Sequence, residues 1–352
     1  MLKVSDFDFD LPTDLIAQEP NKSKEQTKML VFDDNCQMLD KQVIDLLNYI
    51  SEGDVAVFND AKVIKAKLRA KIKRNHSILD FNLDQQIKKE RNSIIWQALC
   101  RPAKKVNEGD VLEIADDFQA QVKKKMDNGL IILHFSYETK DFFEKIDKYG
   151  SIPLPPYIKR DEQLESDLAS YQTIYANNGV AVAAPTAGLH FSPNLMEKIK
   201  QKKAKIAFVT LNVGAGTFLP VKSDLIQDHT MHTESFSISQ ETADIINNAK
   251  KSGNKIIAIG TTSLRVLESV VDKNGSVREC VSDTKIFIYP PYDFKIVDIL
   301  MTNFHLPKST LFMLICAFIG TNQSHQLYKY AIEKKYRFYS YGDSTLLIRK
   351  AI

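Results

Sequence analysis

The sequence predicts an α/β protein that carries a small all-β module inserted in its chain. Short strand-like runs separated by turns fill residues 62–148, whereas strands alternate with helices from residue 150 onwards. At 352 residues the chain is also long for one hydrophobic core, so two domains are expected. We therefore expect a discontinuous α/β domain of residues 1–60 and 150–352, with residues 61–149 as the inserted domain.

The first segment supplies elements of the α/β domain. Apolar runs at residues 29–32 and 55–58 predict strands, and the pattern at residues 43–50 predicts a helix. Asn59 and Asp60 follow the second strand, where their side chains can hydrogen-bond to their own backbone and form a turn.

A strict alternation of apolar and basic residues opens the inserted module at residues 64–73. Period two is the pattern of a half-buried β-strand, with the apolar side chains on one face. The cations on the other face are Lys65, Lys67, Arg69, Lys71 and Lys73. Such a row is either a solvated strand face or a stripe that binds nucleic-acid phosphates, and the segment alone leaves both interpretations open.

The rest of the module consists of further strand-like runs and ends in a stiff connector. The runs are residues 93–99, 111–114, 119–123 and 130–135, and Asn128-Gly129 before the last one is a strong hairpin signal. Residues 150–157 then contain three prolines in four positions, which is typical of a connector.

Three loops in the second half of the chain share one pattern of strand, tight turn and helix. They lie at residues 180–191, 255–269 and, more loosely, 299–320. In open α/β sheets such loops follow the carboxyl ends of strands, where helix N-termini present unpaired N–H groups to a ligand. The pattern predicts one composite pocket, with Thr186 and His190 in its first loop.

The helix that follows the second strand could bind an anion at its start. Thr261, Thr262 and Arg265 offer two hydroxyls and a guanidinium beside free backbone N–H groups, which suits a carboxylate or a phosphate. Capping of the helix explains the hydroxyls equally well. His305 and Lys308 lie similarly at a helix entry in the third loop.

Gly214-x-Gly216 after a predicted strand invites a dinucleotide-binding or methyltransferase interpretation. Glu234 even lies about 20 residues further on, where a ribose-binding acid would be expected. The third glycine is missing, however, and Pro220 stands where a helix should run. A turn without a dinucleotide role is therefore favoured.

His229, His232 and Glu234 resemble a cluster of metal ligands. Their spacing is neither a zinc-finger type nor a helical pair of histidines, so we predict no metal. A base with an orienting carboxylate is the favoured functional interpretation, and ordinary surface polarity is the alternative.

Aromatic and charged residues interleave over residues 336–343. Such residues can stack on nucleobases. A last strand with Phe338 inside is the commoner arrangement and is the one we predict.

Composition excludes several classes of protein. A net charge of +3 is too small to indicate a nucleic-acid partner by itself, and the four cysteines form no Cys-x-x-Cys pair, which fits a reducing compartment. Residues 1–8 contain Asp6 and Asp8 and lack the apolar stretch of a signal peptide, and the most apolar window, residues 311–319, is too short to cross a bilayer. We expect a soluble, cytoplasmic protein that does not bind membranes.

Several blocks of sequence together resemble one family from end to end. The most specific are Ala-Ala-Pro-Thr-Ala-Gly-Leu-His-Phe at residues 183–191, Gly-Thr-Thr-Ser-Leu-Arg at 260–265 and Thr-Asn-Phe-His-Leu-Pro-Lys-Ser-Thr at 302–310. They resemble the S-adenosylmethionine:tRNA ribosyltransferase-isomerases of queuosine biosynthesis. Two positions depart from the pattern: Asn212 replaces a usual histidine, which argues against an essential imidazole there, and Pro291 replaces a usual glycine.

The resemblance implies a fold and a reaction. The fold is a three-layer α/β domain with an inserted small β-barrel. The reaction transfers and isomerises the ribosyl part of S-adenosylmethionine onto 7-aminomethyl-7-deazaguanine at the tRNA wobble position, giving epoxyqueuosine-tRNA and releasing adenine and methionine. S-adenosylmethionine is consumed as a substrate, so no cofactor and no metal is expected. We expect the protein to act as a monomer with tRNA as its partner.

Site residues follow from the family's blocks. His190 and His232, the latter oriented by Glu234, are the candidate catalytic acids or bases. Thr261, Thr262 and Arg265 are expected to hold the methionine carboxylate or the ribose, with His305 and Lys308 near the purine or the wobble base. The full set of expected substrate-binding residues is Thr186, Gly188, Gly214, Gly216, Thr217, Gly260, Thr261, Thr262, Arg265, Asn303, His305 and Lys308. The basic stripe of residues 65–73 is expected to bind RNA.

Overall fold

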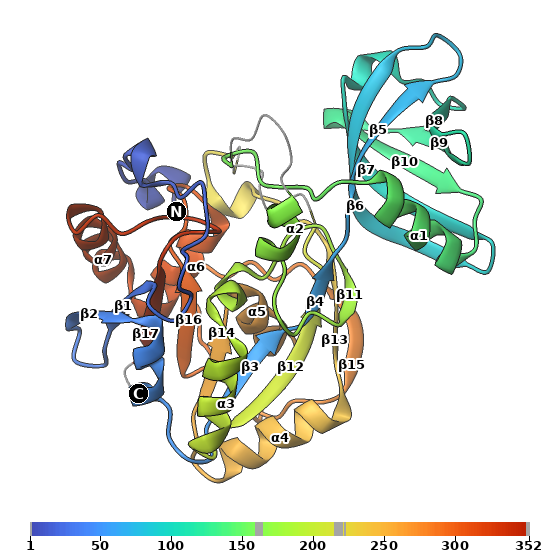
Figure 1. Ribbon diagram of the computed structural model, residues 1–352. Coiled ribbons are helices and arrows are strands. Elements are labelled where there is room, and N and C mark those ends of the chain that lie inside the picture. Colours follow the sequence, from blue (N-terminus) through green and yellow to red (C-terminus); the bar gives the residue numbers. More distant parts are fainter. Residues whose placement is uncertain (1, 159–164, 215–220, 222, 350–352) are drawn as a thin grey trace.

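The computed structural model describes residues 2–158, 165–214, 221 and 223–349 (Figure 1). Within these ranges a nine-stranded mixed sheet is the largest element, and a closed barrel lies to one side of it. In spatial order the strands of the sheet are β15 (Cys280–Thr284), β13 (Glu234–Ile238), β12 (Lys205–Leu211), β3 (Val55–Asn59), β14 (Ile256–Ile259), β16 (Ile299–Asn303), β17 (Ser344–Ile348), β1 (Lys28–Phe32) and β2 (Met38–Gln42).

The centre of the sheet is parallel. Strands β12, β3, β14 and β16 run in the same direction as their neighbours within this group, whereas β13 and β17 flank it antiparallel. The carboxyl ends of these four strands therefore meet at one edge, and ligands of open α/β sheets bind at such an edge. Each loop that the sequence predicts to line a pocket follows or adjoins one of these four strands.

Both faces of the sheet are buried, as a three-layer fold requires. Along β3, Val55 and Val57 point into one core and Ala56 and Phe58 into the other, because successive side chains alternate across a strand. The helices of the first core are α4 (Gln240–Lys251), α5 (Thr261–Val270), α6 (Thr310–Ile319) and α7 (Thr321–Glu333). The second core is covered by α3 (Pro193–Gln201) and the 3-10 helix η3 (Val43–Tyr49). The predicted fold class is thus confirmed.

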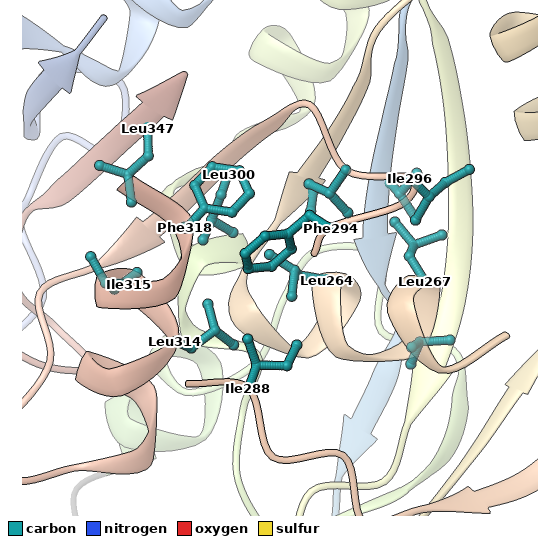
Figure 2. Close-up of a cluster of buried hydrophobic side chains, with 14 of the residues drawn as sticks. Leu264, Leu267, Ile288, Phe294, Ile296, Leu300, Leu314, Ile315, Phe318 and Leu347 are labelled. Atoms are coloured by element: carbon teal, nitrogen blue, oxygen red, sulfur yellow. The ribbon is translucent and has the colours of Figure 1, made fainter. Parts of the chain in front are cut away.

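The first core anchors two helices whose N-termini lie at the carboxyl edge of the sheet. Figure 2 shows Leu264 and Leu267 of α5 beside the apolar side chains of α6 and of the loop before β16. The rings of Phe294 and Phe318 meet edge-on, with centroids 4.9 Å apart. Helix α6 also begins at a sequence-encoded cap, because Ser309 Oγ accepts a hydrogen bond from the backbone N–H of Phe312. Core packing and the Ser309 cap therefore fix the N-termini of α5 and α6 at the edge of the sheet where a ligand would approach.

The inserted module forms the expected β-barrel. Its strands, in closed order, are β10 (Leu130–Phe135), β7 (Ser93–Arg101), β6 (Ile78–Glu90), β5 (Lys67–Ile72), β8 (Val111–Ala115) and β9 (Phe118–Lys125). Along β5 the apolar residues are buried and the cations exposed, as the alternation predicted. Helix α1 (Thr139–Tyr149) packs on this core through Phe142 and Ile146.

Two connections join the barrel to the α/β domain. Strand β4 (Ala61–Val63) pairs in parallel with β11 (Asn178–Ala181), and the backbone N–H of Lys67 bonds to the carbonyl of Ser151. A short helix, α2 (Glu165–Ser170), follows the second connection. The domain boundaries at residues 60 and 150 stay predictions.

Some predicted elements were wrong in type or extent. Residues 336–343 are not a strand. Phe338 is buried but forms only an isolated β-bridge with Ile16, and the last strand begins at Ser344. In place of the predicted helix at residues 43–50, the segment Val43–Tyr49 folds as a 3-10 helix. Strand β6 was missed because its second half is polar and exposed, so the period-two pattern fades there.

No helix along the described residues is long and apolar enough to span a bilayer.

Candidate active site

The three predicted loops meet in one pocket at the carboxyl edge of the sheet. This strand-end pocket has a volume of about 330 Å³. It is lined by residues 183–187 after β11, by the start of α5, and by residues 302–311, which comprise the end of β16 and the segment that follows it. Of the expected substrate-binding residues it contains Thr186, Gly260, Thr261, Thr262, Arg265, Asn303, His305 and Lys308. The predicted convergence of these loops is confirmed.

The start of α5 presents unpaired donors to this pocket. The helix begins at Thr261 after Gly260, whose φ of 91° is a left-handed conformation that favours glycine, and no side chain caps it. The alternative interpretation, in which the hydroxyls cap the helix, was therefore wrong, because the cap position holds a glycine. The Thr262 hydroxyl and the Nε and Nη2 atoms of Arg265 are buried without a hydrogen-bond partner among the described residues. These donors and the positive end of the helix dipole suit a bound anion.

Arg265 is held from behind by Glu234. Its Nη1 lies 2.5 Å from Glu234 Oε2, and both side chains are only about one-twentieth exposed (6% and 5%). The contact with Glu234 restricts the orientation of the guanidinium. Breaking the pair would be costly, because removing either partner would leave an uncompensated charge inside the protein. Arg265 also lines the strand-end pocket, and its Nε and Nη2 atoms have no hydrogen-bond partner among the described residues.

Glu234 also borders a second, smaller pocket. This interface pocket of about 120 Å³ lies between the barrel and the sheet. The barrel contributes Asp84, Gln85, Gln86 and Gln97, and the residues from the α/β domain include Asn212, Gly214, His232 and Glu234. The predicted site residues Gly214, His232 and Glu234 are thus separated from the loops of the strand-end pocket. Gly216 and Thr217 lie outside the described residues.

His190 lies behind the wall of the strand-end pocket and does not line it. Its Nε2 is 3.2 Å from the Nδ2 atom of Asn303, whose Oδ1 accepts a hydrogen bond of 3.0 Å from the Thr186 hydroxyl. Burial lowers the pKa of His190 to about 4, with smaller contributions from the positive charges of Arg337 and Lys24. The imidazole is therefore neutral at neutral pH and reaches the pocket only through Asn303.

Gly188 has a packing role at this position. A β-carbon there would collide with the hydroxyl of Tyr175, and Gly188 does not line the pocket. Only glycine therefore fits between this turn and the Tyr175 ring.

His305 and Lys308 line the opposite wall. Burial lowers the pKa of His305 to about 3, and its backbone N–H donates to the Tyr328 hydroxyl at 3.1 Å. Lys308 Nζ lies 2.7 Å from Asp8 Oδ2, so the N-terminal segment holds this lysine at the rim. A neutral imidazole and a tethered ammonium can hydrogen-bond to the nitrogens of a heterocycle.

A sequence profile of the family described as queuosine biosynthesis protein matches residues 4–347. The chain belongs to the queuosine biosynthesis protein family. It is 48% identical over 360 residues to an S-adenosylmethionine:tRNA ribosyltransferase-isomerase of Rickettsia bellii, covering 99% of this chain and 100% of that protein. A protein of the same name from Caulobacter vibrioides is 43% identical over 368 residues, with 99% of each chain covered.

The solved structures also contain a member of this family. The crystal structure of S-adenosylmethionine tRNA ribosyltransferase from Thermotoga maritima is 32% identical to this chain, with a TM-score of 0.56. The match covers 98% of this chain and 100% of that one. The curated relatives are transferase-isomerase enzymes by name, and this queuosine biosynthesis family member shares the fold of the Thermotoga maritima protein over 98% of its chain.

Several residues that line the two pockets of this family member were not predicted from the sequence, among them Tyr157, Tyr339, Ser340, Asp84 and Gln97. Tyr157, Tyr339 and Ser340 belong to the strand-end pocket, where the tyrosine ring centroids are 4.0 Å apart and the Tyr157 hydroxyl lies 2.5 Å from Ser340 Oγ. The aromatic run at residues 336–343 was a signal for Tyr339 and Ser340, but it was interpreted as a strand. Asp84 and Gln97 lie inside barrel strands and gave no signal.

The basic stripe of this family member lies on the outside of the barrel. Lys67, Arg69 and Lys71 are exposed on β5, and Lys73 follows them. Arg69 Nε lies 3.9 Å from Asp80 Oδ1 on β6, whereas Lys65 donates to the Asp147 carbonyl. An exposed row of cations remains for a polyanion.

Within the described ranges, no group of three or more His, Cys, Asp or Glu side chains could hold a metal ion. The ring of His229, one of the residues that suggested a cluster, instead packs against Phe287, with centroids 5.3 Å apart.

Proposed function

We propose that the protein transfers and isomerises the ribosyl part of S-adenosylmethionine onto 7-aminomethyl-7-deazaguanine at the tRNA wobble position. The products are epoxyqueuosine-tRNA, adenine and methionine. Family membership makes this reaction the leading candidate. The single observation in the structure that supports it best is the strand-end pocket, with a buried, half-paired arginine at the uncapped start of α5.

We assign the methionine carboxylate of S-adenosylmethionine to that helix start. The free edge of Arg265 can bind a carboxylate with two parallel hydrogen bonds, and the first N–H groups of α5 and the Thr262 hydroxyl add further donors. Binding the carboxylate there would fix the amino-acid end of the substrate and leave the sulfonium and nucleoside to fill the rest of the pocket.

The aromatic wall and His305 suit the adenine. Tyr157 and Tyr339 provide faces against which a purine can stack, and neutral His305 can hydrogen-bond to it. Adenine leaves in the reaction, so a hydrogen bond to a purine nitrogen would stabilise the developing negative charge on the departing base.

Proton transfer is the second requirement of this chemistry. The sulfonium acidifies the C5′ hydrogens, so a positioned base can remove one, and the acceptor amine must be neutral to attack the ribosyl carbon. We propose His232 with Glu234 as candidates in the interface pocket. His190 would act through Asn303 and Thr186 by orienting the Thr186 hydroxyl.

The remaining partners follow from the same reaction. We propose that the exposed cations of β5 bind the tRNA backbone and that a monomer carries out the reaction in the cytoplasm. S-adenosylmethionine supplies its own leaving group as a sulfonium, so we propose that neither a cofactor nor a metal takes part.

One incubation tests the proposed function. The purified protein is mixed with S-adenosylmethionine and tRNA carrying the aminomethyl base, and the small-molecule products are separated. Equal amounts of adenine and methionine, with no release from tRNA that has guanine at the wobble position, are expected. S-adenosylhomocysteine would instead show a methyltransferase, and the absence of any product would leave the protein as an RNA binder.

A further inference from the structure

The interface pocket is a polar cavity built by both domains. Its barrel side carries Asp84 of β6 and Gln97 of β7, and its sheet side carries Asn212 and Glu234. Carboxylates and side-chain amides therefore face one another across about 120 Å³. This lining contrasts with the strand-end pocket, whose walls include aromatic, proline and alanine residues.

The walls of the interface pocket are held in place by close contacts. Gln97 Nε2 donates to Asp84 Oδ2 at 2.8 Å, and a β-carbon on Gly214 would lie 2.7 Å from Asp84 Oδ1. Glycine at position 214 thus lets the barrel carboxylate approach the α/β domain. On the other side, Asn212 accepts from the Val180 N–H at 2.7 Å and donates to Ser235 Oγ at 2.9 Å. A pocket organised in this way binds without first ordering its side chains.

The chemistry of the lining matches a guanine-type base. Such a base presents adjacent N–H donors at N1 and N2, which a carboxylate accepts as a pair, and a carbonyl oxygen, which an amide N–H₂ can bind. An aminomethyl substituent adds another donor group. The Watson–Crick edge of adenine presents one donor beside one acceptor, so adenine fits a carboxylate less well.

The two pockets share a wall made by a buried ion pair. Arg265 lines the strand-end pocket, and Glu234, 2.5 Å away, lines the interface pocket. Group transfer needs donor and acceptor in adjoining sites, because holding the reacting atoms together removes most of the entropic cost of their encounter. We propose that the interface pocket binds the acceptor base of the tRNA, with Asp84 as the barrel residue that recognises its donor edge. This inference rests on the function proposed above.

Replacing one carboxylate oxygen tests the assignment. Asp84→Asn puts an N–H₂ group where the base needs an acceptor, yet it keeps an oxygen for Gln97. Wild-type protein is expected to bind tRNA with the aminomethyl base more tightly than the same tRNA with wobble guanine. In Asp84→Asn we expect the affinity for the aminomethyl tRNA to fall on the order of tenfold, with the Kd for S-adenosylmethionine unchanged.

Asp116→Asn is the matched control. It makes the same change on the same barrel, at an exposed turn between β8 and β9, and is expected to bind both tRNAs like the wild type. An unchanged affinity for the aminomethyl tRNA in Asp84→Asn, or an equal fall in Asp116→Asn, would overturn the assignment.

A measurement on the wild-type protein covers the case in which Asp84→Asn fails to fold. The free base 7-aminomethyl-7-deazaguanine is expected to inhibit competitively against the modified tRNA and not against S-adenosylmethionine. Competition with S-adenosylmethionine, or no competition with tRNA, would place the base elsewhere and overturn the proposal. Failure of the proposed function itself gives a different result, because wild-type protein would then release no adenine with either tRNA.

Discussion

Asn303 and His190 contact each other through their side chains in the wall behind the strand-end pocket, with 3.2 Å between Nδ2 and Nε2. Because the amide nitrogen is a donor, His190 Nε2 accepts and the ring proton is assigned to Nδ1. The same Nδ2 donates to the Tyr339 carbonyl, and Oδ1 accepts from Thr186. One amide therefore orients a hydroxyl of the first loop, a ring behind it and a backbone segment near the C-terminus.

We predict that Asn303→Ala lowers kcat by about tenfold to a hundredfold and changes the KM for S-adenosylmethionine much less. The reason is that Thr186 loses its acceptor and His190 its donor, whereas the carboxylate-binding end of the pocket is untouched. Steady-state kinetics measures both constants. Asn247→Ala is the control, since the Asn247 amide also hydrogen-bonds through both its oxygen and its nitrogen, in this case to the Val277 backbone, and Asn247 lies on α4 outside both pockets. Equal kinetics in the two variants would contradict the prediction.

Variants of the Arg265–Glu234 pair should show separate effects on the free energy of unfolding and on the affinity for S-adenosylmethionine. Arg265→Met leaves a buried carboxylate without its counter-charge, which costs about 3–5 kcal/mol in the free energy of unfolding. The double variant Arg265→Met with Glu234→Gln removes that charge and should recover part of the stability, but its affinity for S-adenosylmethionine should stay low. Urea unfolding and calorimetric titration measure the two quantities. Wild-type affinity in the double variant would remove Arg265 from the binding site.

Two neutral histidines should make the fold sensitive to acid. The pKa values of His190 and His305 are lowered by burial from 6.5 to about 4 and about 3. Between these values and 6.5 the unfolded chain binds protons that the folded protein does not, so stability is full above pH 6.5 and falls as the pH is lowered. In His190→Gln, unfolding near pH 5 should take up about one proton less, measured as a shallower dependence of unfolding free energy on pH. An identical slope in wild type and variant would show that His190 is not buried in its neutral form.

The basic stripe predicts a salt-dependent effect on tRNA alone. Charge reversal at Lys67, Arg69 and Lys71 should weaken tRNA binding. The logarithm of the binding constant should also depend less steeply on the logarithm of the salt concentration, because fewer counterions are released. The KM for S-adenosylmethionine should not change. Exposed lysines on α3, α4 and α7 provide a control triple of the same charge: Lys200→Glu, Lys251→Glu and Lys329→Glu. A similar loss in both triples would mean that net charge, and not the stripe, governs tRNA affinity.

The parts of this structure that could be predicted from sequence are those set by local periodicity. Alternation over residues 64–73 predicted the exposed and buried faces of β5, and the strand–turn–helix loops converge because the carboxyl ends of parallel strands share an edge. Long-range relationships left no such pattern. Arg265 and Glu234 lie on different elements and are 31 positions apart, and their contact appears only when α5 packs beside β13.

The direction in which a single side chain points could also not be predicted from the sequence. His190 reads as a pocket residue because it follows the turn, yet the 3-10 turn at Thr186–His190 directs it behind the wall. Residues 336–343 looked like a strand because aromatic and polar positions alternate there. Tyr339 instead adopts a left-handed φ of 75°, which breaks an extended chain and brings the ring beside Tyr157.

The approach of Asp84 to Gly214 brings the barrel into the wall of the interface pocket. If the two pockets bind as proposed, cutting the chain at the domain connections would produce an α/β half that keeps the site for the sulfonium donor but only one side of the site for its acceptor. Specificity for the modified nucleotide would then be a property of neither half, and the two could not be exchanged independently between members of the family.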